Sequence, residues 1–288
     1  MAKLKAKIVR LQTKDNLELQ GLLFETEQPT KSAVIHIHGW TGNFYENIFL
    51  EHIAQGLIDK SFSFLTFNNR GAGFVQEFMK KNGSNIEYAK LGGSLERFED
   101  CLIDIESAVN FMQSLGYNNL YLQGHSTGSQ KAAYYASQTK TDIKGLILLE
   151  PTDDPAVTKK DLGSRYKEAL GIAREYIDSG NPQKAMPDWI PFGVELSAQR
   201  FLSLADPKSA EGQLFHFSDD LNELKRINCP ILAVYGAKTQ YQENPASALE
   251  ILSQQLPAVT TKLIDNADHW FRRYEDELKS IIIEWLRT

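Results

Sequence analysis

The sequence contains few cysteines and no long apolar run. Only Cys101 and Cys229 occur among 288 residues, so a disulfide scaffold is excluded and we expect both to be reduced, small apolar side chains. No apolar run approaches the roughly 20 residues that a transmembrane helix needs, so we expect no membrane span. Residues 1–7 include three lysines, and the apolar stretch after them is too short for a secretory signal. We therefore expect a cytoplasmic location.

The sequence also lacks an excess of positive charge. Its 31 basic and 37 acidic side chains give a formal net charge of −6, without a long block of either sign. A surface that follows nucleic-acid phosphates requires clustered positive charge, so DNA and RNA are not expected partners. The acidic cluster Glu99, Asp100 and Asp104 has no matching histidine or cysteine set, and we therefore expect a solvated helix face rather than a metal site.

Short apolar segments recur along most of the chain. Residues 7–12 and 17–24 alternate apolar and polar side chains around Asp15-Asn16, which predicts an antiparallel hairpin at the edge of a sheet. Continuous apolar runs are typical of strands buried on both faces of a parallel sheet. Such runs lie at 33–37, 62–67, 120–122, 146–149 and 231–235.

Amphipathic helical patterns separate these segments. Between Leu95 and Met112, and again from Leu278 to Leu286, apolar residues recur every three or four positions. The alternation predicts a doubly wound α/β fold with a mostly parallel eight-stranded sheet. Residues 151–226 break the rhythm, because they are polar, helix-rich and aromatic. We therefore predict a helical cap at 151–226, inserted into a core of residues 1–150 and 227–288.

The sequence around Ser126 has the pattern of a reactive serine. The apolar segment 120–122 leads into Gly124-His125-Ser126-Thr127-Gly128, and a helical pattern follows. In such a G-x-S-x-G turn between strand and helix, the two glycines leave room for a sharp bend that exposes the serine hydroxyl. The alternative is that Ser126 only caps the helix.

In these residues the chain resembles the α/β-hydrolase superfamily. His38-Gly39-Trp40, Asn69-Arg70-Gly71, the Ser126 turn, the strand ending at Gly236 and Asp268-His269 follow the order and approximate spacing of that family. The resemblance covers nearly the whole chain. Thr127 and the His-Gly-Trp-Thr-Gly-Asn loop are also similar to a subgroup that includes fungal siderophore-ester hydrolases. The resemblance implies Ser126 as nucleophile and His269 as its base, without metal or organic cofactor.

The triad acid departs from the family pattern. Thr239 stands where most members have an aspartate, and a threonine has no charge to stabilise an imidazolium. Glu150, which ends the buried segment 146–149, is the first candidate, because a glutamate there needs a partner. Asp153 and Asp154 are alternatives, although turn chemistry before Pro155 also explains them. Glu243, or no acid at all, are further possibilities.

The remaining site predictions concern the loops around Ser126. By position in the family, the backbone N–H groups of Trp40 and Thr127 form the oxyanion hole. Four residues are candidates for binding substrate: His38, Gly39, His125 and Trp189. For His38 and His125 we weigh a structural role, shaping the loop and packing under the turn, against this one.

The predicted function is a serine hydrolase that cleaves a small-molecule carboxylic ester through an acyl-serine intermediate. A thioesterase, acyltransferase or peptidase would use the same serine. The alternative from another class is a ligand-binding or sensor protein that keeps the fold with little catalysis, as Thr239 suggests.

Overall fold

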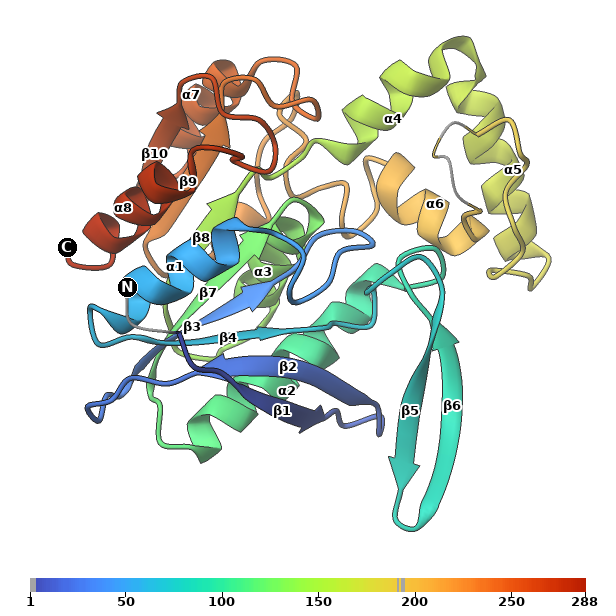
Figure 1. The fold of residues 1–288 in the computed structure, drawn as a ribbon. Coiled ribbons are helices and arrows are strands. Elements are labelled where there is room, and N and C mark those ends of the chain that lie inside the picture. Colours follow the sequence, from blue (N-terminus) through green and yellow to red (C-terminus); the bar gives the residue numbers. More distant parts are fainter. Residues whose placement is uncertain (1–3, 191, 193–194) are drawn as a thin grey trace.

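An eight-stranded sheet runs through the molecule in the computed structural model, which describes residues 4–190, 192 and 195–288 (Figure 1). The strand order is β1-β2-β4-β3-β7-β8-β9-β10. These strands are β1 (Lys7–Gln12), β2 (Glu18–Phe24), β3 (Ser32–Ile37), β4 (Ser63–Phe67), β7 (Asn119–His125), β8 (Ile143–Leu149), β9 (Ile231–Gly236) and β10 (Val259–Ile264).

The sheet is parallel except at one edge. β1 pairs antiparallel with β2, and β2 pairs antiparallel with β4, whereas β4, β3, β7, β8, β9 and β10 pair parallel with one another. Every residue of β4 and β9 is buried, as continuous apolar runs require. The predicted eight-stranded, mostly parallel sheet and its edge hairpin are confirmed.

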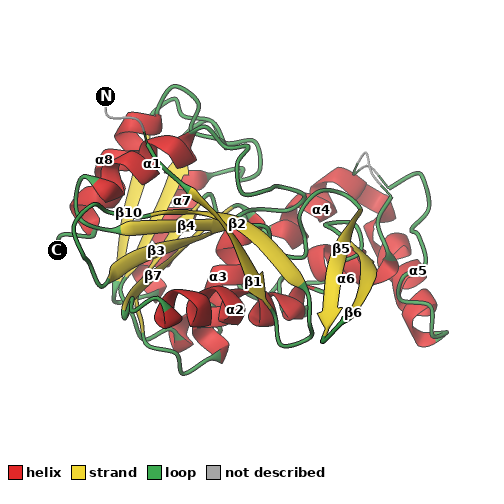
Figure 2. Ribbon diagram, turned by 60° about the horizontal axis from the view of Figure 1, so that its bottom comes forward, coloured by secondary structure: helices red, strands yellow, loops and turns green. Residues whose placement is uncertain are grey.

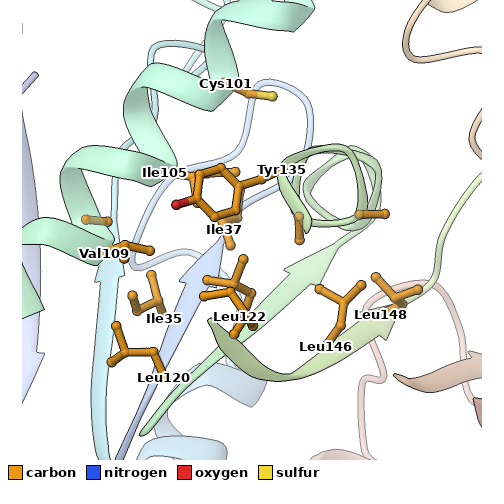
Figure 3. Packing of buried hydrophobic residues seen from close by; sticks show 14 of the residues in the cluster. Ile35, Ile37, Cys101, Ile105, Val109, Leu120, Leu122, Tyr135, Leu146 and Leu148 are labelled. Carbon is orange, nitrogen blue, oxygen red and sulfur yellow. The ribbon is translucent and has the colours of Figure 1, made fainter. Parts of the chain in front are cut away.

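Helices cover both faces of the sheet (Figure 2). On one face α2 (Cys101–Ser114), α3 (Thr127–Gln138) and α7 (Pro245–Gln255) supply buried apolar side chains to one core, and on the other face α1 (Phe49–Ile58) and α8 (Glu275–Trp285) supply a second. Figure 3 shows Ile105 and Val109 of α2 above Ile35 of β3 and Leu122 of β7. Both cysteines are free, and Cys101 belongs to the first core.

A third core lies among the helices between β8 and β9. α4 (Asp154–Leu162), α5 (Tyr166–Asp178) and α6 (Ala198–Ala205) enclose apolar residues that include Leu162, Leu170 and Phe201. Phe215 and Leu221, in contrast, pack in the core of the sheet. The predicted division at 151–226 stays a prediction, and we propose from this packing that the cap ends near residue 205.

A second, two-stranded sheet was not expected from the sequence. β5 (Gln76–Asn82) and β6 (Asn85–Leu91) pair antiparallel around Gly83-Ser84 and project from the molecule in Figure 1. Gly83 has φ +61°, as a tight hairpin turn requires. Ile86 and Tyr88 are exposed, so β6 lacks the one-sided burial that marks most strands in a sequence.

Within the described residues no helix is long and apolar enough to cross a membrane.

Candidate active site

Ser126 lies at a strained turn between β7 and α3. Its backbone has φ 56° and ψ −132°, a conformation that L residues rarely adopt. The Ser126 N–H donates to the Leu149 carbonyl at 2.8 Å, and its own carbonyl accepts from Ser129 N–H at 2.7 Å. A Cβ on Gly124 would lie 2.1 Å from the Gly128 carbonyl oxygen, so the turn can close only with glycine there. The flanking strands therefore hold Ser126 in a fixed, strained position.

The loop after β3 packs directly against this turn. A Cβ built on Gly39 would lie 3.0 Å from the Ser126 Cβ and 2.9 Å from the His125 carbonyl oxygen. The next residue, Trp40, is anchored by its indole N–H, which donates to the Gly93 carbonyl at 2.7 Å. Among the described residues, the backbone N–H groups of Trp40 and Thr127 have no hydrogen-bond acceptor. The predicted oxyanion donors thus belong to two segments in contact beside Ser126.

His269 follows β10 and reaches the same place from the other end of the chain. Its Nδ1 lies 3.2 Å from Glu150 Oε2 and 3.4 Å from Thr239 Oγ1. A carboxylate only accepts hydrogen bonds, so Nδ1 carries the hydrogen when Glu150 is ionised, and Nε2 is then the basic nitrogen. No hydrogen bond joins His269 to the Ser126 hydroxyl in the described part of the chain, but both residues line one cavity.

Glu150 is held where β8 ends. It is fully buried, has φ 53°, and its Oε1 accepts the Gly236 N–H at 2.5 Å. Burial raises the pKa of Glu150 to about 7, while the Gly236 hydrogen bond and Thr239 favour the ionised form. Burial also lowers the pKa of His269 to about 3, opposed by the charge of Asp268. The pair is therefore poised between a neutral and an ionised carboxyl near pH 7.

His125 positions the backbone that carries His269. Its Nε2 lies 2.8 Å from the His269 carbonyl oxygen, which can only accept, so Nε2 is the protonated nitrogen. Burial lowers the pKa of His125 to about 3 and keeps the ring neutral. His125 also lines the cavity, so both roles weighed from the sequence are compatible with its position.

The cavity over Ser126 measures about 540 Å³ and lies between the sheet and the cap. This volume is ordinary for a small-molecule site. Aromatic side chains form much of its wall: Trp40, Phe74, Phe192, Tyr241 and Trp270. Tyr241 packs edge-on against His269, with ring centroids 4.6 Å apart. Phe74, Tyr241 and Trp270 were not predicted, because aromatic residues in loops carry no signal of the cavity that they will face.

Two of the predicted substrate-binding residues lie outside this cavity. His38 is fully buried, with Nδ1 2.8 Å from the Gly39 carbonyl and Nε2 accepting the Asn69 N–H at 3.1 Å. Trp189 packs in the cap with the Arg165 guanidinium 3.4 Å above its ring. The geometry therefore gives their predicted substrate contacts no support, since internal partners occupy both side chains, whereas Gly39 does line the cavity.

The alternative acids have other partners. Asp153 caps α4 by accepting the Ala156 N–H at 3.1 Å, and it also lies 3.0 Å from His216 Nδ1. Asp154 accepts hydrogen bonds from Gln130 Nε2 and Thr152 Oγ1, both at 2.7 Å. Of the three carboxylates, only Glu150 is within hydrogen-bond distance of His269.

The acidic cluster is not wholly the solvated helix face expected from the sequence, because Asp104 is fully buried and pairs with Arg70. The Arg70 Nη2 donates to Asp104 Oδ1 at 2.8 Å, and further pairs join it to Asp15 and Asp100. Among the described residues no group of three or more His, Cys, Asp and Glu side chains could hold a metal ion.

Comparisons with known proteins place this geometry in a wider context. The family model described as "Protein of unknown function (DUF1749)" matches residues 12–286. A search of curated proteins found no match to the sequence.

Solved structures of esterases and hydrolases share the whole fold. The siderophore hydrolase EstB from Aspergillus fumigatus is 16% identical, with TM-score 0.72 over 99% of this chain and 98% of its own. Est1E from Butyrivibrio proteoclasticus with bound ferulic acid is 17% identical, with TM-score 0.68 over 96% and 97%. An esterase of Pyrococcus furiosus is 18% identical, with TM-score 0.62 over 99% and 91%. These likenesses confirm the α/β-hydrolase fold.

Proposed function

The chain belongs to the DUF1749 family, and we propose that it is a serine hydrolase acting on carboxylic esters. One observation carries the proposal: Ser126 and His269 line a common cavity, and His269 Nδ1 faces the buried Glu150. That set supplies a nucleophile, a base and an acid that orients the base.

In the proposed reaction, Ser126 Oγ attacks the acyl carbon while His269 Nε2 takes the hydroxyl proton. The negative charge on the acyl oxygen is stabilised by the N–H groups of Trp40 and Thr127, each such donor being worth about 3 kcal/mol. His269 then gives the proton to the leaving alcohol as the carbon–oxygen bond breaks. Water, deprotonated by His269, attacks the acyl-serine, and the carboxylic acid and free Ser126 are released.

Glu150 replaces the aspartate that Thr239 does not supply. Its carboxylate faces Nδ1, where it selects the tautomer and stabilises the imidazolium that forms during attack. Thr239 adds a second, uncharged contact to the same nitrogen. In this proposal Glu150, at the end of β8, supplies the negative charge of the triad. Thr239, at the usual position of the acid after β9, supplies only a hydrogen bond.

Three measurements test the proposal. We expect the protein to release nitrophenol from short nitrophenyl esters and a fluorophosphonate probe to label Ser126. Ser126→Ala and His269→Gln should abolish both, while Ser280→Ala and His52→Gln, which change an exposed serine of α8 and a histidine of α1, should not. If Ser126→Ala retains turnover, Ser126 is not the nucleophile and the proposed mechanism is wrong. If wild type neither turns over nor is labelled, the protein is a binding or sensor protein rather than a hydrolase.

The same serine serves related acyl-transfer reactions, and a substrate series separates them. Matched oxygen esters, thioesters and amides with one acyl group should be cleaved in an order that identifies the preferred leaving group. We propose that the oxygen esters have the highest kcat/KM.

A further inference from the structure

A second cavity adjoins the cavity over Ser126. It measures about 640 Å³ and lies between α4 of the cap and the segment that runs from the β9–α7 loop into α7. The two cavities share three lining residues: Val157, Asp161 and Tyr241. The two cavities therefore adjoin along these residues, and the proposed reaction does not use the second one.

The position of Tyr241 identifies which part of an ester would extend there. In the proposed reaction His269 must give its proton to the leaving oxygen, so the alcohol part lies on the His269 side. The Tyr241 ring packs against the His269 ring with centroids 4.6 Å apart, and Tyr241 is the wall common to both cavities. The second cavity thus adjoins the leaving-group side of the site.

The polar groups in the second cavity are mostly uncharged. The side chains of Gln240, Gln242 and Ser247 line it and make no hydrogen bonds with other described residues. Amides and hydroxyls both donate and accept, so they match the hydroxyl and amide groups of an uncharged ligand. Apolar contact comes from Val157, Phe217 and Ile251.

The charged groups of this cavity disfavour an anionic ligand. Lys160 Nζ lies 3.6 Å from Glu243 Oε1, so its charge has a partner. Asp153 accepts the N–H groups of Ala156 and Phe217 and contacts His216. The exposed carboxylate of Asp161 stands at the boundary with the first cavity and opposes an anionic arm.

We propose that the second cavity binds the alcohol part of the substrate, and that this alcohol is not anionic and bears amide or hydroxyl groups beyond the ester oxygen. The inference rests on the proposed serine-hydrolase function. The acyl carbon bonds to Ser126 Oγ, the bond to the alcohol oxygen breaks, and that oxygen takes the proton from His269. The alcohol leaves from the second cavity before water attacks the acyl-serine.

The test compares two butyrate esters that give the same acyl-enzyme. One is methyl butyrate, and the other is the butyrate ester of N-acetylserine methylamide, whose alcohol carries two amides. We expect kcat/KM to be at least about tenfold higher for the amide-bearing ester, the effect of about two hydrogen bonds. Because deacylation is common to both esters, the preference should appear mainly in kcat/KM rather than in kcat when deacylation limits turnover.

Two variants place a bulky side chain in the second cavity from opposite walls. Ser247→Trp acts from α7 and Ala156→Trp from α4. Ala246→Trp, an exposed neighbour on α7 that does not line the cavity, is the matched control. Labelling by the fluorophosphonate probe measures the fraction of each preparation that has a reactive Ser126. A misfolded cavity variant is recognised by low labelling, and the test then uses the other cavity variant.

The expected result is a preference that falls to about one in Ser247→Trp and Ala156→Trp and stays at the wild-type value in Ala246→Trp. A wild-type ratio near one, or a ratio unchanged in both cavity variants, overturns the inference while Ser126-dependent cleavage of methyl butyrate leaves the proposed function intact. Absence of Ser126 labelling and of any turnover is a different pattern, which overturns the proposed function itself.

Discussion

Glu150 Oε2 lies 3.2 Å from His269 Nδ1, although 119 positions separate the two residues along the chain. β8 and β9 are neighbours in the sheet, and the Glu150 side chain spans the gap between their carboxyl ends. The Gly236 N–H fixes Oε1, which leaves Oε2 to face the imidazole. A carboxylate at the end of β8 therefore faces the imidazole, where the resemblance to the α/β-hydrolase superfamily would put an aspartate after β9.

The first prediction concerns this carboxylate. Glu150→Gln keeps the shape of the side chain but removes its charge, and we expect kcat to fall by about two orders of magnitude or more, about 3 kcal/mol in transition-state energy. Steady-state kinetics with a short nitrophenyl ester measure the loss. Glu284→Gln, at an exposed position of α8, should leave kcat unchanged. A Glu150→Gln enzyme with wild-type kcat would show that the imidazole needs no charge from β8.

The second prediction uses Thr239 to restore that charge. Its Oγ1 lies 3.4 Å from His269 Nδ1, so a carboxylate at this position can reach the same nitrogen. Adding Thr239→Asp to Glu150→Gln should recover kcat at least about tenfold over Glu150→Gln alone. Thr239→Asn in the same background lacks the charge and should give no recovery. Equal rates for the Asp and Asn variants would contradict the electrostatic role given to this position.

Much of the fold could be predicted because buried parallel strands have an obvious sequence pattern. The apolar run 231–235 became β9, with every residue buried, and the run 33–37 became β3. The hairpin of β5 and β6 was missed, since β6 is largely exposed and β5, which is mostly half-buried, has Phe78 as its one buried residue. Its one local signal was the Gly83-Ser84 turn, which a search for buried apolar runs does not detect.

The site could be predicted only as far as local motifs reach. Ser126 and His269 were predicted from the turn and from position near the end of the chain, but the acid stayed open among Glu150, Asp153, Asp154, Glu243 and no acid at all. The path of the chain after β8 sets which carboxylate faces His269, and it depends on tertiary packing: Asp153 turns toward α4 and His216. Residues from distant loops, such as Phe74 and Tyr241, meet in the cavity for the same reason.

The third prediction concerns the strained turn that holds Ser126. A Cβ on Gly128 would lie 2.1 Å from the Ile37 carbonyl oxygen. This oxygen belongs to the backbone, which cannot move aside as the end of a flexible side chain can. Gly128→Ala should therefore lower the free energy of unfolding by about 2 kcal/mol or more, as overpacking does. Gly171→Ala is the matched control, because that glycine lies in α5 with nothing within 4 Å of its built Cβ. The control should stabilise slightly, by about 0.5–1 kcal/mol.

Chemical denaturation followed by circular dichroism measures both free energies, and Ser126 labelling at low temperature reports whether the folded Gly128→Ala protein keeps its reactive serine. If Gly128→Ala is as stable as Gly171→Ala, then β3 and the turn are not packed as closely as the structure has them.

The last prediction is the pH dependence of catalysis. Burial raises the pKa of Glu150 to about 7 against the opposing hydrogen bonds from Gly236 and Thr239, and burial lowers the pKa of His269 to about 3. A neutral imidazole beside an ionised Glu150 is the competent form, so kcat/KM should rise with pH through an apparent pKa near 7 that belongs to the pair. Below that pH, Glu150 binds a proton and kcat/KM should fall about tenfold per unit.

The Glu150→Gln enzyme identifies the group behind this profile. Without the carboxyl, its low kcat/KM should vary little between about pH 5.5 and 8, because His269 is already neutral throughout that range.

The stability of the wild type should also depend on pH through Glu150. The folded-state pKa of Glu150 is raised above its unfolded value, so its contribution to stability is complete below the unfolded pKa and is lost as pH rises through about 7. The stability of Glu150→Gln relative to wild type should therefore increase between pH 5 and pH 8. If kcat/KM of this variant still rises near pH 7, the titrating group is not Glu150.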